Sequence, residues 1–445
     1  MIETRQARVS WWAIAMLTTT TGVQVIVEAT SLAPLTFTLK KFVDDPALIA
    51  FLGSINLAFS FLVAPLASWK SDRIWTRFGR RKPFLVVGWS VLALALLACP
   101  WAPNLWMLIV IILIWQFSTD VGYGAVWSPL FFEIVPKSQR GRAVVIKKIM
   151  SIVGLIFFNY VLLSQFDAIY SVRIPFFGGQ KLTGEQVIYF TASLLVAMAV
   201  AHIALRVREN PPSHAVPAQR FHPLSFFREV FASRQWVMIY LLLFCSVSLT
   251  AGLGQLAPLL ITEQFGYSKK LLGQIQTLQL ILNLLVALPI AALIADRFDR
   301  FRIFQIGLFF TTFHAIAYWA WVKFITPSGI PDPATILAFG LAHSIVDSIA
   351  VLAIEPYFYD LTPPNQMGTM NSGFLIVSNA LKMALMTGVG LWVKFYSSIF
   401  CSPGSYDYMS GYLFVFLVSI GGCAISVFFA AERKAGRIVE AKKDS

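Results

Sequence analysis

Long apolar segments separated by short polar connectors follow one another along the whole chain. Apolar residues run with few interruptions over 48–69 and again over 84–98, and about 20 such residues cross a bilayer as a helix. Between these segments, Ser71–Pro83 surrounds a single acid, Asp72, with the cations Arg73, Arg77, Arg80, Arg81 and Lys82. A charged connector between two membrane-length segments belongs in the water at a bilayer surface. The pattern therefore predicts membrane-spanning helices.

Twelve segments of this kind can be placed, six on each side of a polar connector that contains four prolines. The pattern predicts an all-α membrane protein with an N-terminal six-helix bundle over 1–206, a cytoplasmic connector over 207–235, and a C-terminal six-helix bundle with a short cytoplasmic tail over 236–445. The predicted spans are 11–39, 48–69, 84–102, 105–133, 143–166, 186–206, 236–263, 271–295, 303–325, 335–361, 368–396 and 409–431.

The distribution of lysine and arginine predicts the orientation of the spans. With the N-terminus inside, the inner connectors hold the basic clusters, whereas the outer connectors hold only scattered cations. Loops rich in lysine and arginine stay in the cytoplasm, so we expect both termini there and a location in the inner (plasma) membrane. The first apolar stretch is too long for the core of a signal peptide, and we expect it to be an uncleaved span.

Short motifs recur at a nearly constant spacing, which indicates an internal repeat. LAPL at Leu32–Leu35 returns at Leu256–Leu259, an offset of 224 residues, and Asp120 corresponds to Asp347 at an offset of 227. Two parallel repeats of six spans predict a carrier that binds its substrate between its halves and exposes the site to each side in turn.

The composition excludes several classes of protein. The chain is 57% hydrophobic and 13% charged, against about 25% charged residues in soluble domains. The net charge of +13 lies in clusters between apolar spans, which is typical of membrane topology and not of nucleic-acid binding. Three of the four cysteines fall inside spans, so no structural disulfide is expected. No nucleotide-binding or metal-binding motif occurs, so we expect no enzyme activity, no cofactor and no metal.

The charged connector also carries a recognisable motif. It contains DRxxxRxGRR and reads SDRIWTRFGRRKPF over 71–84. This resembles the loop signature of the major facilitator superfamily, and the longer form is similar to sucrose and maltose proton symporters and to glycoside–pentoside–hexuronide carriers. TGVQVIVEATSLAPL (Thr21–Leu35) resembles the first span of the sucrose carriers, and Asp120 stands where that branch keeps a fourth-span acid. The branch usually has an arginine shortly after the fourth-span proline, whereas apolar residues follow Pro129 here.

This resemblance covers almost the whole chain. It implies two pseudo-symmetric six-helix bundles, with spans one, four, seven and ten lining a central cavity. The acids within the spans would then lie on cavity helices.

The charged connectors are predicted to form a cytoplasmic gate. Charge-assisted bonds from Asp72 to nearby arginines would hold the cytoplasmic ends together while the substrate site faces outward, and Gly79 would allow a tight turn. A basic loop can also fix orientation without moving, and for the arginines this interpretation stays open. The predicted gate residues are Asp72, Arg73, Arg77, Gly79, Arg80, Arg81, Arg140, Asp296 and Arg297.

Acids inside the spans are the candidates for ion coupling. A charge at mid-bilayer costs about 2.5–3.5 kcal/mol on insertion scales, so each one needs a reason. We expect Asp120 in span four to be the main coupling acid, followed by Glu28 in span one and Asp347 in span ten. The alternative is a fixed ion pair between helices, for example Lys382 with Asp347. Glu133 lies nearer the cytoplasmic end and is expected to pair with loop cations or to cap a helix.

A sugar-like cargo needs hydrogen-bonding partners and flat rings on which to stack. Amides within spans also join helices, and aromatic rings also fill cores, so these alternatives stay open for each residue. His314 is expected to be structural. The predicted substrate-binding residues are Gln24, Gln116, Tyr123, Trp127, Gln255, Asn283, Glu355 and Lys382.

These features together predict a monomeric secondary active transporter in a lipid bilayer. Its expected cargo is a small molecule, a disaccharide or glycoside, moved with a proton. Sodium coupling or a non-sugar cargo is the alternative within transport. A non-transporting sensor or assembly protein with a transporter fold is the alternative of another class.

Overall fold

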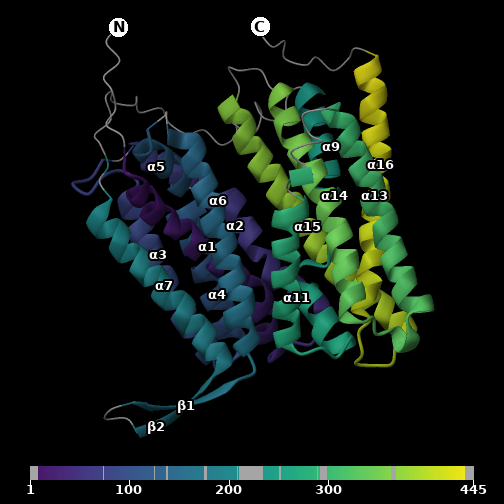
Figure 1. Cartoon of the computed structure of the whole chain (residues 1–445), viewed down its shortest axis with the longest axis horizontal. Coiled ribbons are helices and arrows are strands. Elements are labelled where there is room, and N and C mark those ends of the chain that lie inside the picture. The colour runs from purple at the N-terminus through teal and green to yellow at the C-terminus, as the bar shows by residue number, and fades with distance from the viewer. Residues whose placement is uncertain are drawn as a thin grey trace. The chain divides into compact units, whose positions relative to one another are not determined.

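Helices dominate the computed structural model, which describes residues 9–73, 75–124, 126–136, 139–174, 178–207, 209, 234–249, 252–287, 289–290, 298–361 and 367–435. Ten helical segments in this part of the chain are long and apolar enough to cross a membrane. Two shorter apolar helices, Pro46–Ser60 and Val237–Ser248, account for the second and seventh predicted spans. Long helices make up nearly all of the fold (Figure 1). The ten long and two shorter apolar helices confirm the predicted all-α membrane fold with twelve spans.

The chain forms two compact units, and each unit includes a segment from the other half of the sequence. The first consists of Met1–Asp44, Leu62–Gln219 and Ser268–Thr277, and the second of Asp45–Phe61, Arg220–Tyr267 and Leu278–Ser445. Two helices, α2 (Pro46–Arg73) and α11 (Lys269–Leu282), therefore contribute residues to both units. The bundle boundaries proposed from the repeat, at 206 and 236, stay a prediction.

The first unit contains most of the N-terminal spans. Its elements, besides parts of α2 and α11, are α1 (Trp11–Lys40), α3 (Lys82–Ala98), η1 (Cys99–Trp101), α4 (Leu105–Thr119), η2 (Asp120–Gly124), α5 (Trp127–Ile134), α6 (Arg140–Ile156), η4 (Phe157–Leu162), η5 (Leu163–Gln165), β1 (Ile169–Ile174), β2 (Gly178–Thr183) and α7 (Gly184–Arg206). Helix α1 packs on α6 and α7, and α3 packs on α4 and α7. Ser10 caps α1 and Asn104 caps α4, each with a side-chain oxygen on a backbone N–H of the first turn.

The second unit contains most of the C-terminal spans. Its elements, besides parts of α2 and α11, are α9 (Arg234–Leu249), η6 (Gly254–Leu256), α10 (Ala257–Leu259), η7 (Leu260–Gln264), η8 (Asn283–Ala287), α13 (Arg300–Ala320), η9 (Trp321–Ile325), η10 (Pro327–Gly329), α14 (Pro333–Asp360), α15 (Met367–Phe400), η12 (Tyr408–Ser410) and α16 (Gly411–Lys434). Helix α13 packs on α14 and α16, and α9 packs on α15 and α16. Phe301, Phe304, Tyr357 and Phe429 belong to the buried core of this unit.

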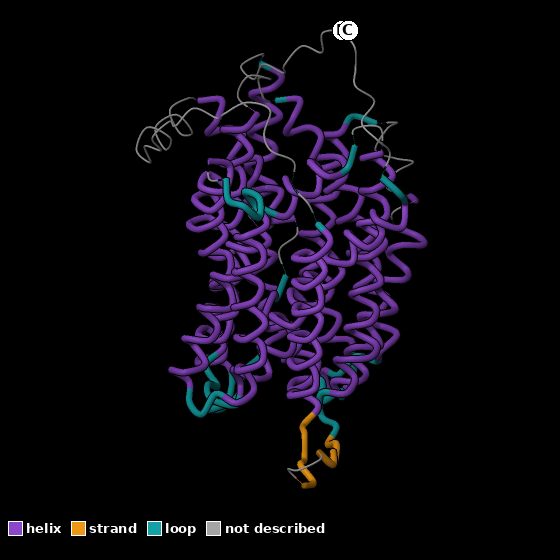
Figure 2. The backbone as a smooth tube through the Cα atoms, turned by 90° about the vertical axis from the view of Figure 1, so that its left-hand side faces the viewer, coloured by secondary structure: helices purple, strands orange, loops and turns teal. Residues whose placement is uncertain are grey.

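A β-hairpin lies between the fifth and sixth spans and was not predicted. Strands β1 and β2 pair antiparallel, from Ile169 opposite Thr183 to Ile174 opposite Gly178. The hairpin extends beyond the ends of the helices that it joins (Figures 1 and 2). The segment YSVRI alternates polar and apolar residues, which is a strand pattern, but it is too short to stand out beside helices of membrane length.

Several predicted spans are not continuous α-helices, and two of these irregular segments lie beside candidate residues. The span over 105–133 contains the π-helix η2 between α4 and α5. The span over 236–263 ends as α9 at Leu249 and resumes with η6 at Gly254, whose φ of 53° is left-handed. Glycine adopts this conformation without strain, so a glycine-containing segment can break a helix here.

Glycines allow η2 to lie close to α3. A Cβ atom on Gly88 would come within 2.8 Å of Gly122 Cα and 2.9 Å of the Ser118 carbonyl oxygen. Both neighbours are backbone atoms, which cannot rotate away as a side chain can. This close approach positions Tyr123, in the same π-helix, against α3.

We expect Gly88→Ala to destabilise the protein by about 1–3 kcal/mol, because the added methyl group overpacks this contact. Thermal unfolding of the purified protein in one detergent measures the effect. Gly252→Ala is the matched control, since no atom of the described residues lies within 4 Å of a Cβ atom there. Equal unfolding temperatures for Gly88→Ala and the control would show that the contact relaxes freely.

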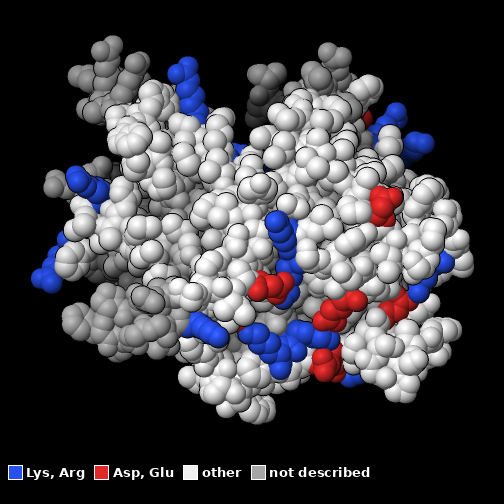
Figure 3. Space-filling model, turned by 60° about the horizontal axis from the view of Figure 1, so that its bottom comes forward, with Lys and Arg blue, Asp and Glu red and all other residues white. Residues whose placement is uncertain are grey.

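Lysines at the predicted outer helix ends are paired with acids inside their own unit. Figure 3 shows acidic and basic side chains next to each other on this end of the molecule. The pairs are Lys40–Asp44 at 3.1 Å, Lys41–Glu185, Lys269–Asp167 at 2.6 Å, Lys323–Asp407 at 2.7 Å and Lys394–Asp45 at 2.6 Å.

Candidate functional site

Hydrogen bonds gather several predicted residues around the middle of α1 in the first unit. Gln24 Nε2 donates to Glu28 Oε1 at 3.0 Å, one helical turn apart. Trp127 Nε1 of α5 donates to Thr21 Oγ1 at 3.2 Å, and both residues are buried. The buried Gln24 Oε1 has no hydrogen-bond partner among the described residues. The arrangement leaves an amide oxygen beside a carboxyl group.

Stacked aromatic rings lie against this group. The Tyr123 ring stacks on Trp89 with centroids 5.6 Å apart and on Trp127 with centroids 5.8 Å apart, at interplanar angles of 13° and 20°. The Tyr123 side chain also interacts with Thr21 and, electrostatically, with Glu28. The structure therefore brings together four residues that the sequence singled out: Gln24, Glu28, Tyr123 and Trp127.

Asp120 begins the π-helix that carries Tyr123. The residue is 7% exposed, and its backbone N–H closes the last turn of α4 by donating to the Gln116 and Phe117 carbonyl groups. Gln116 lies one turn earlier and is buried, with Nε2 lacking a partner among the described residues. Single π-helical turns inside helices occur frequently at functional sites. The predicted coupling acid thus sits at the irregular point of its span.

Polar groups also meet in the second unit, where η8 packs on α14. Asn283, the first residue of η8, donates to Ser344 Oγ and accepts from Ser348 Oγ at 3.2 Å. Gln255 is buried and donates to the Gly53 carbonyl oxygen at 3.0 Å. These bonds join neighbouring helical segments. Both amides therefore have the structural role that was left open as an alternative to substrate binding.

Asp347 lies near two stacked histidines. The rings of His343 and His314 have centroids 5.2 Å apart, and His314 Nε2 lies 3.0 Å from the Phe339 carbonyl oxygen. Asp347 Oδ1 and His343 Nδ1 are buried without hydrogen-bond partners among the described residues. The two side chains are one turn apart on α14, on the same helix face. The sequence did not single out His343, although its spacing of four from Asp347 was a usable signal.

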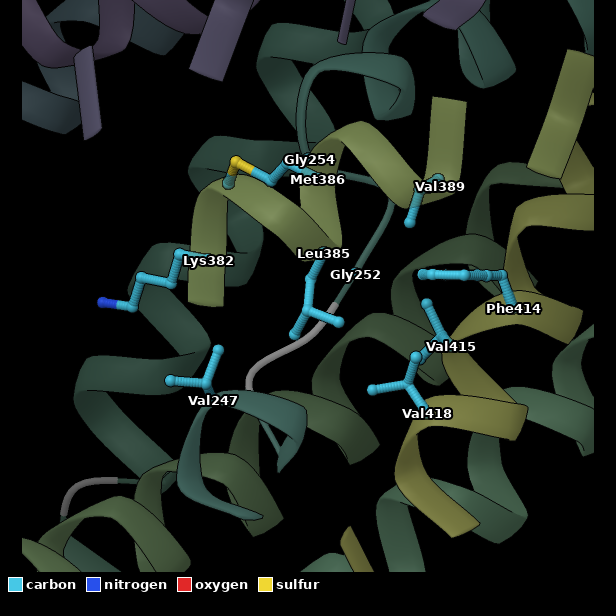
Figure 4. Close-up of a pocket in the computed structure, with 10 residues that line it drawn as sticks. All are labelled: Val247, Gly252, Gly254, Lys382, Leu385, Met386, Val389, Phe414, Val415 and Val418. Atoms are coloured by element: carbon cyan, nitrogen blue, oxygen red, sulfur yellow. The ribbon is translucent and has the colours of Figure 1, made fainter. Parts of the chain in front are cut away.

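Lys382 borders an apolar cavity of about 280 Å³ in the second unit. The cavity lies beside the break after α9 and is lined by Gly252, Met386, Phe414 and Val415, among others. Figure 4 shows the Lys382 side chain extending away from Phe414 and Val415. Within the described side chains Lys382 has no ion pair, so the alternative Lys382–Asp347 pair is not formed in this structure. The cavity suits the apolar part of a small molecule.

Residues of the first charged connector are tied to the first unit. Arg80 and Arg81 both form ion pairs with Glu133, which confirms the predicted role of Glu133 as a partner of loop cations. Glu209 accepts hydrogen bonds from the backbone N–H groups of Arg80 at 2.9 Å, Arg81 at 3.1 Å and Lys82. Lys82 Nζ in turn donates to the carbonyl oxygens that end α7.

The bonds of Glu209 and Lys82 together join the start of α3 to the end of α7. A carboxylate meets the positive end of one helix dipole, and an ammonium group meets the negative end of the other. Glu209 was not predicted as a site residue, because it lies in the predicted polar connector. The only signal was a single acid directly after a span in a basic stretch.

Gly79 makes the predicted tight turn, with φ of 112°. Thr76 and Gly79 exchange backbone hydrogen bonds of 3.1 and 3.0 Å. Arg77 is exposed and lies over the Phe78 ring at 4.6 Å. Several predicted residues lie outside what the structure describes: the side chains of Asp72, Arg73, Arg140 and Glu355, and all of Asp296 and Arg297.

The membrane-spanning helices of both units hold carboxyl groups and amides, and those of the first unit also hold stacked rings. Polar groups of this kind within spans are typical of a membrane transport protein. The chain belongs to the Major Facilitator Superfamily, whose family model matches residues 12–387. The family and fold identify a transporter of small molecules, and not an enzyme. No curated protein matches the chain by sequence.

Solved structures share the fold at low sequence identity. A POT family transporter in complex with a thioalcohol-conjugated peptide gives a TM-score of 0.70 at 11% identity, over 96% of this chain and 97% of that chain. A D-xylose–proton symporter gives 0.66 at 11% identity, over 94% and 97%. The nucleoside transporter NupG gives 0.65 at 14% identity, over 94% and 99%. These similarities show the major facilitator fold.

Proposed function

We propose that the chain is a proton-coupled symporter for a disaccharide or glycoside, of the sucrose/maltose and glycoside–pentoside–hexuronide branch. It would work by alternating access in the inner (plasma) membrane, with both termini in the cytoplasm. The solved structures of similar fold include transporters of sugar, nucleoside and peptide. They leave the cargo open, so the proposal depends on this chain's own residues.

The group around Glu28 carries the sugar proposal. It combines a carboxyl group, the amide of Gln24 and a stack of three aromatic rings centred on Tyr123. Sugars present hydroxyl groups that bind to amides and carboxylates, and C–H faces that pack on rings.

Coupling is assigned first to Asp120, with Glu28 and Asp347 as further candidates. An acid within a span that takes up and releases a proton links the chemical gradient to the conformation, because the charged and neutral forms favour different surroundings. The gate is assigned to the connectors, with Arg80 and Arg81 held by Glu133 and Glu209 in the conformation seen here. Asp72 and Asp296 remain the proposed latch acids.

Sodium coupling, a non-sugar cargo and a non-transporting sensor are the rival functions. The buried acids favour an ion-coupled carrier over a sensor, since such groups are costly to keep within a membrane. A non-sugar cargo is the rival to test, because structures of similar fold include a nucleoside transporter and a transporter in complex with a peptide.

Uptake by the purified protein in proteoliposomes tests this proposal. A panel of radiolabelled disaccharides and glycosides is offered under an imposed pH gradient, and then under a sodium gradient. We expect accumulation of at least one sugar that a proton ionophore abolishes. Accumulation under the sodium gradient alone would show that the coupling ion is sodium and not a proton. No sugar uptake, with uptake of nucleosides or peptides, would refute the sugar assignment.

A further inference from the structure

The ends of α13 and α16 border an open basic cavity in the second unit, distant in the sequence from the polar groups described above. The cavity measures about 670 Å³ and is lined by Arg302, Gln305, Arg433 and Lys434, together with one acid, Asp299. Among the described lining residues, three cations against one carboxylate leave an excess of two positive charges. The basic residues occupy the first turn of α13 and the last turn of α16, where the predicted spans meet the cytoplasm.

The single acid in the cavity is already engaged. Asp299 Oδ1 caps α13 by accepting from the Arg302 backbone N–H at 2.8 Å, and Oδ2 accepts from Arg433 at 3.3 Å. The Arg302 guanidinium and the Lys434 ammonium group form no ion pair with the described side chains, and both residues are exposed. The positive end of the α13 dipole adds to their charge. The cavity is therefore complementary to an anion.

Exposed apolar side chains continue from the cavity along both helices. Ile306 and Phe309 lie one turn after Arg302 and Gln305 on α13 and are 69% and 50% exposed. Val427, one turn before Ala431 on α16, is 54% exposed. Residues four apart share a helix face, so these side chains lie directly on the membrane side of the basic cavity. A ligand that fills both regions has an anionic head and an apolar tail.

We propose that this cavity binds the phosphate headgroup of an anionic phospholipid, whose acyl chains pack along Ile306, Phe309 and Val427. Basic pockets between helix ends on the cytoplasmic side suit such headgroups. A free phosphate would use the cations but gain nothing from the apolar faces. Arg433 also lies over the rings of Phe301 and Tyr357, at 5.8 and 5.5 Å, so the occupied site is connected to the buried core. Binding therefore stabilises the folded second unit.

Full-length protein in nanodiscs tests the site without any transport gradient. Nanodiscs are made from phosphatidylcholine alone or from a mixture with phosphatidylglycerol, and thermal unfolding is combined with native mass spectrometry of retained lipid. We expect a higher unfolding temperature and retained phosphatidylglycerol for the unaltered protein. Arg302→Gln with Lys434→Gln should weaken retention by at least about tenfold, because each interfacial cation contributes to binding an anionic lipid.

A matched control removes two cations elsewhere. Lys70→Gln with Lys148→Gln lowers the net charge equally, at exposed positions of the first unit, and should keep the response to phosphatidylglycerol. Equal loss in both double variants, or equal retention of phosphatidylcholine, would overturn the proposal. Stabilisation by inorganic phosphate in phosphatidylcholine nanodiscs that matches phosphatidylglycerol would show an anion site without lipid specificity. Should the double variant fold poorly, Lys434→Gln alone in the exposed last turn of α16 provides the same comparison.

Discussion

Asp120→Asn is expected to abolish substrate accumulation driven by a pH gradient while leaving exchange of substrate across the membrane intact. Asparagine matches aspartate in shape, so the packing of this 7%-exposed residue is kept while its proton-binding carboxylate is lost. With one proton per substrate, a gradient of one pH unit supports about tenfold accumulation. Without the coupling acid the accumulation ratio should fall to about one. Uptake and counterflow measured on the same proteoliposomes separate these two activities.

Asp167→Asn is the matched control, because Asp167 is an exposed acid of the same unit, paired with Lys269 at 2.6 Å. It should accumulate substrate like the unaltered protein. Full accumulation by Asp120→Asn would move the coupling role to Glu28 or Asp347, whose amide variants are then measured in the same way. Loss of both accumulation and counterflow would show that Asp120 acts in binding or folding, and not in coupling alone.

Glu209→Gln is expected to release the start of α3 from the end of α7. The carboxylate accepts from three consecutive backbone N–H groups, at Arg80, Arg81 and Lys82. Hydrogen bonds to a charged group contribute about 1.5–3 kcal/mol each, and a neutral amide replaces them poorly. We expect at least about tenfold faster hydrogen exchange at these three amides. Mass spectrometry of the peptide that covers 78–85 measures it.

Glu133→Gln supplies the comparison for this experiment. It removes the side-chain partner of Arg80 and Arg81 but leaves the backbone acceptor in place. Its amide exchange over 80–82 should stay close to that of the unaltered protein. Equally fast exchange in both variants would mean that the arginine side chains, and not the Glu209 carboxylate, hold this segment.

The positions of the spans could be predicted closely because burial in a bilayer imposes one requirement, about 20 apolar residues, on each of them. Their interruptions could not. Gly122 in η2 and Gly254 after α9 each belong to a Gly-x-Gly pair, with Gly124 and Gly252, and glycines often occur in continuous helices within membranes. Whether they break the helix depends on packing, such as the contact of Gly88 with η2. That contact joins residues more than 30 positions apart.

The candidate site was predictable in its residue types and less so in its contacts. Charge within a span singles out Glu28 and Asp120, whatever the fold. The stacking of Tyr123 between Trp89 and Trp127 depends on how α3 meets η2, which no local pattern specifies. Glu209 was missed for the same reason, since its three partners lie more than 120 residues earlier in the chain.

Each compact unit includes a segment from the other half of the sequence, and this has a consequence for biosynthesis. Residues 268–277 belong to the first unit, although more than 40 residues of the second unit precede them in the chain. A ribosome that has just released the sixth span has therefore not yet made all of the first unit. Its last segment arrives only with the eighth span, so the contacts of the first unit are complete only once that span has been inserted.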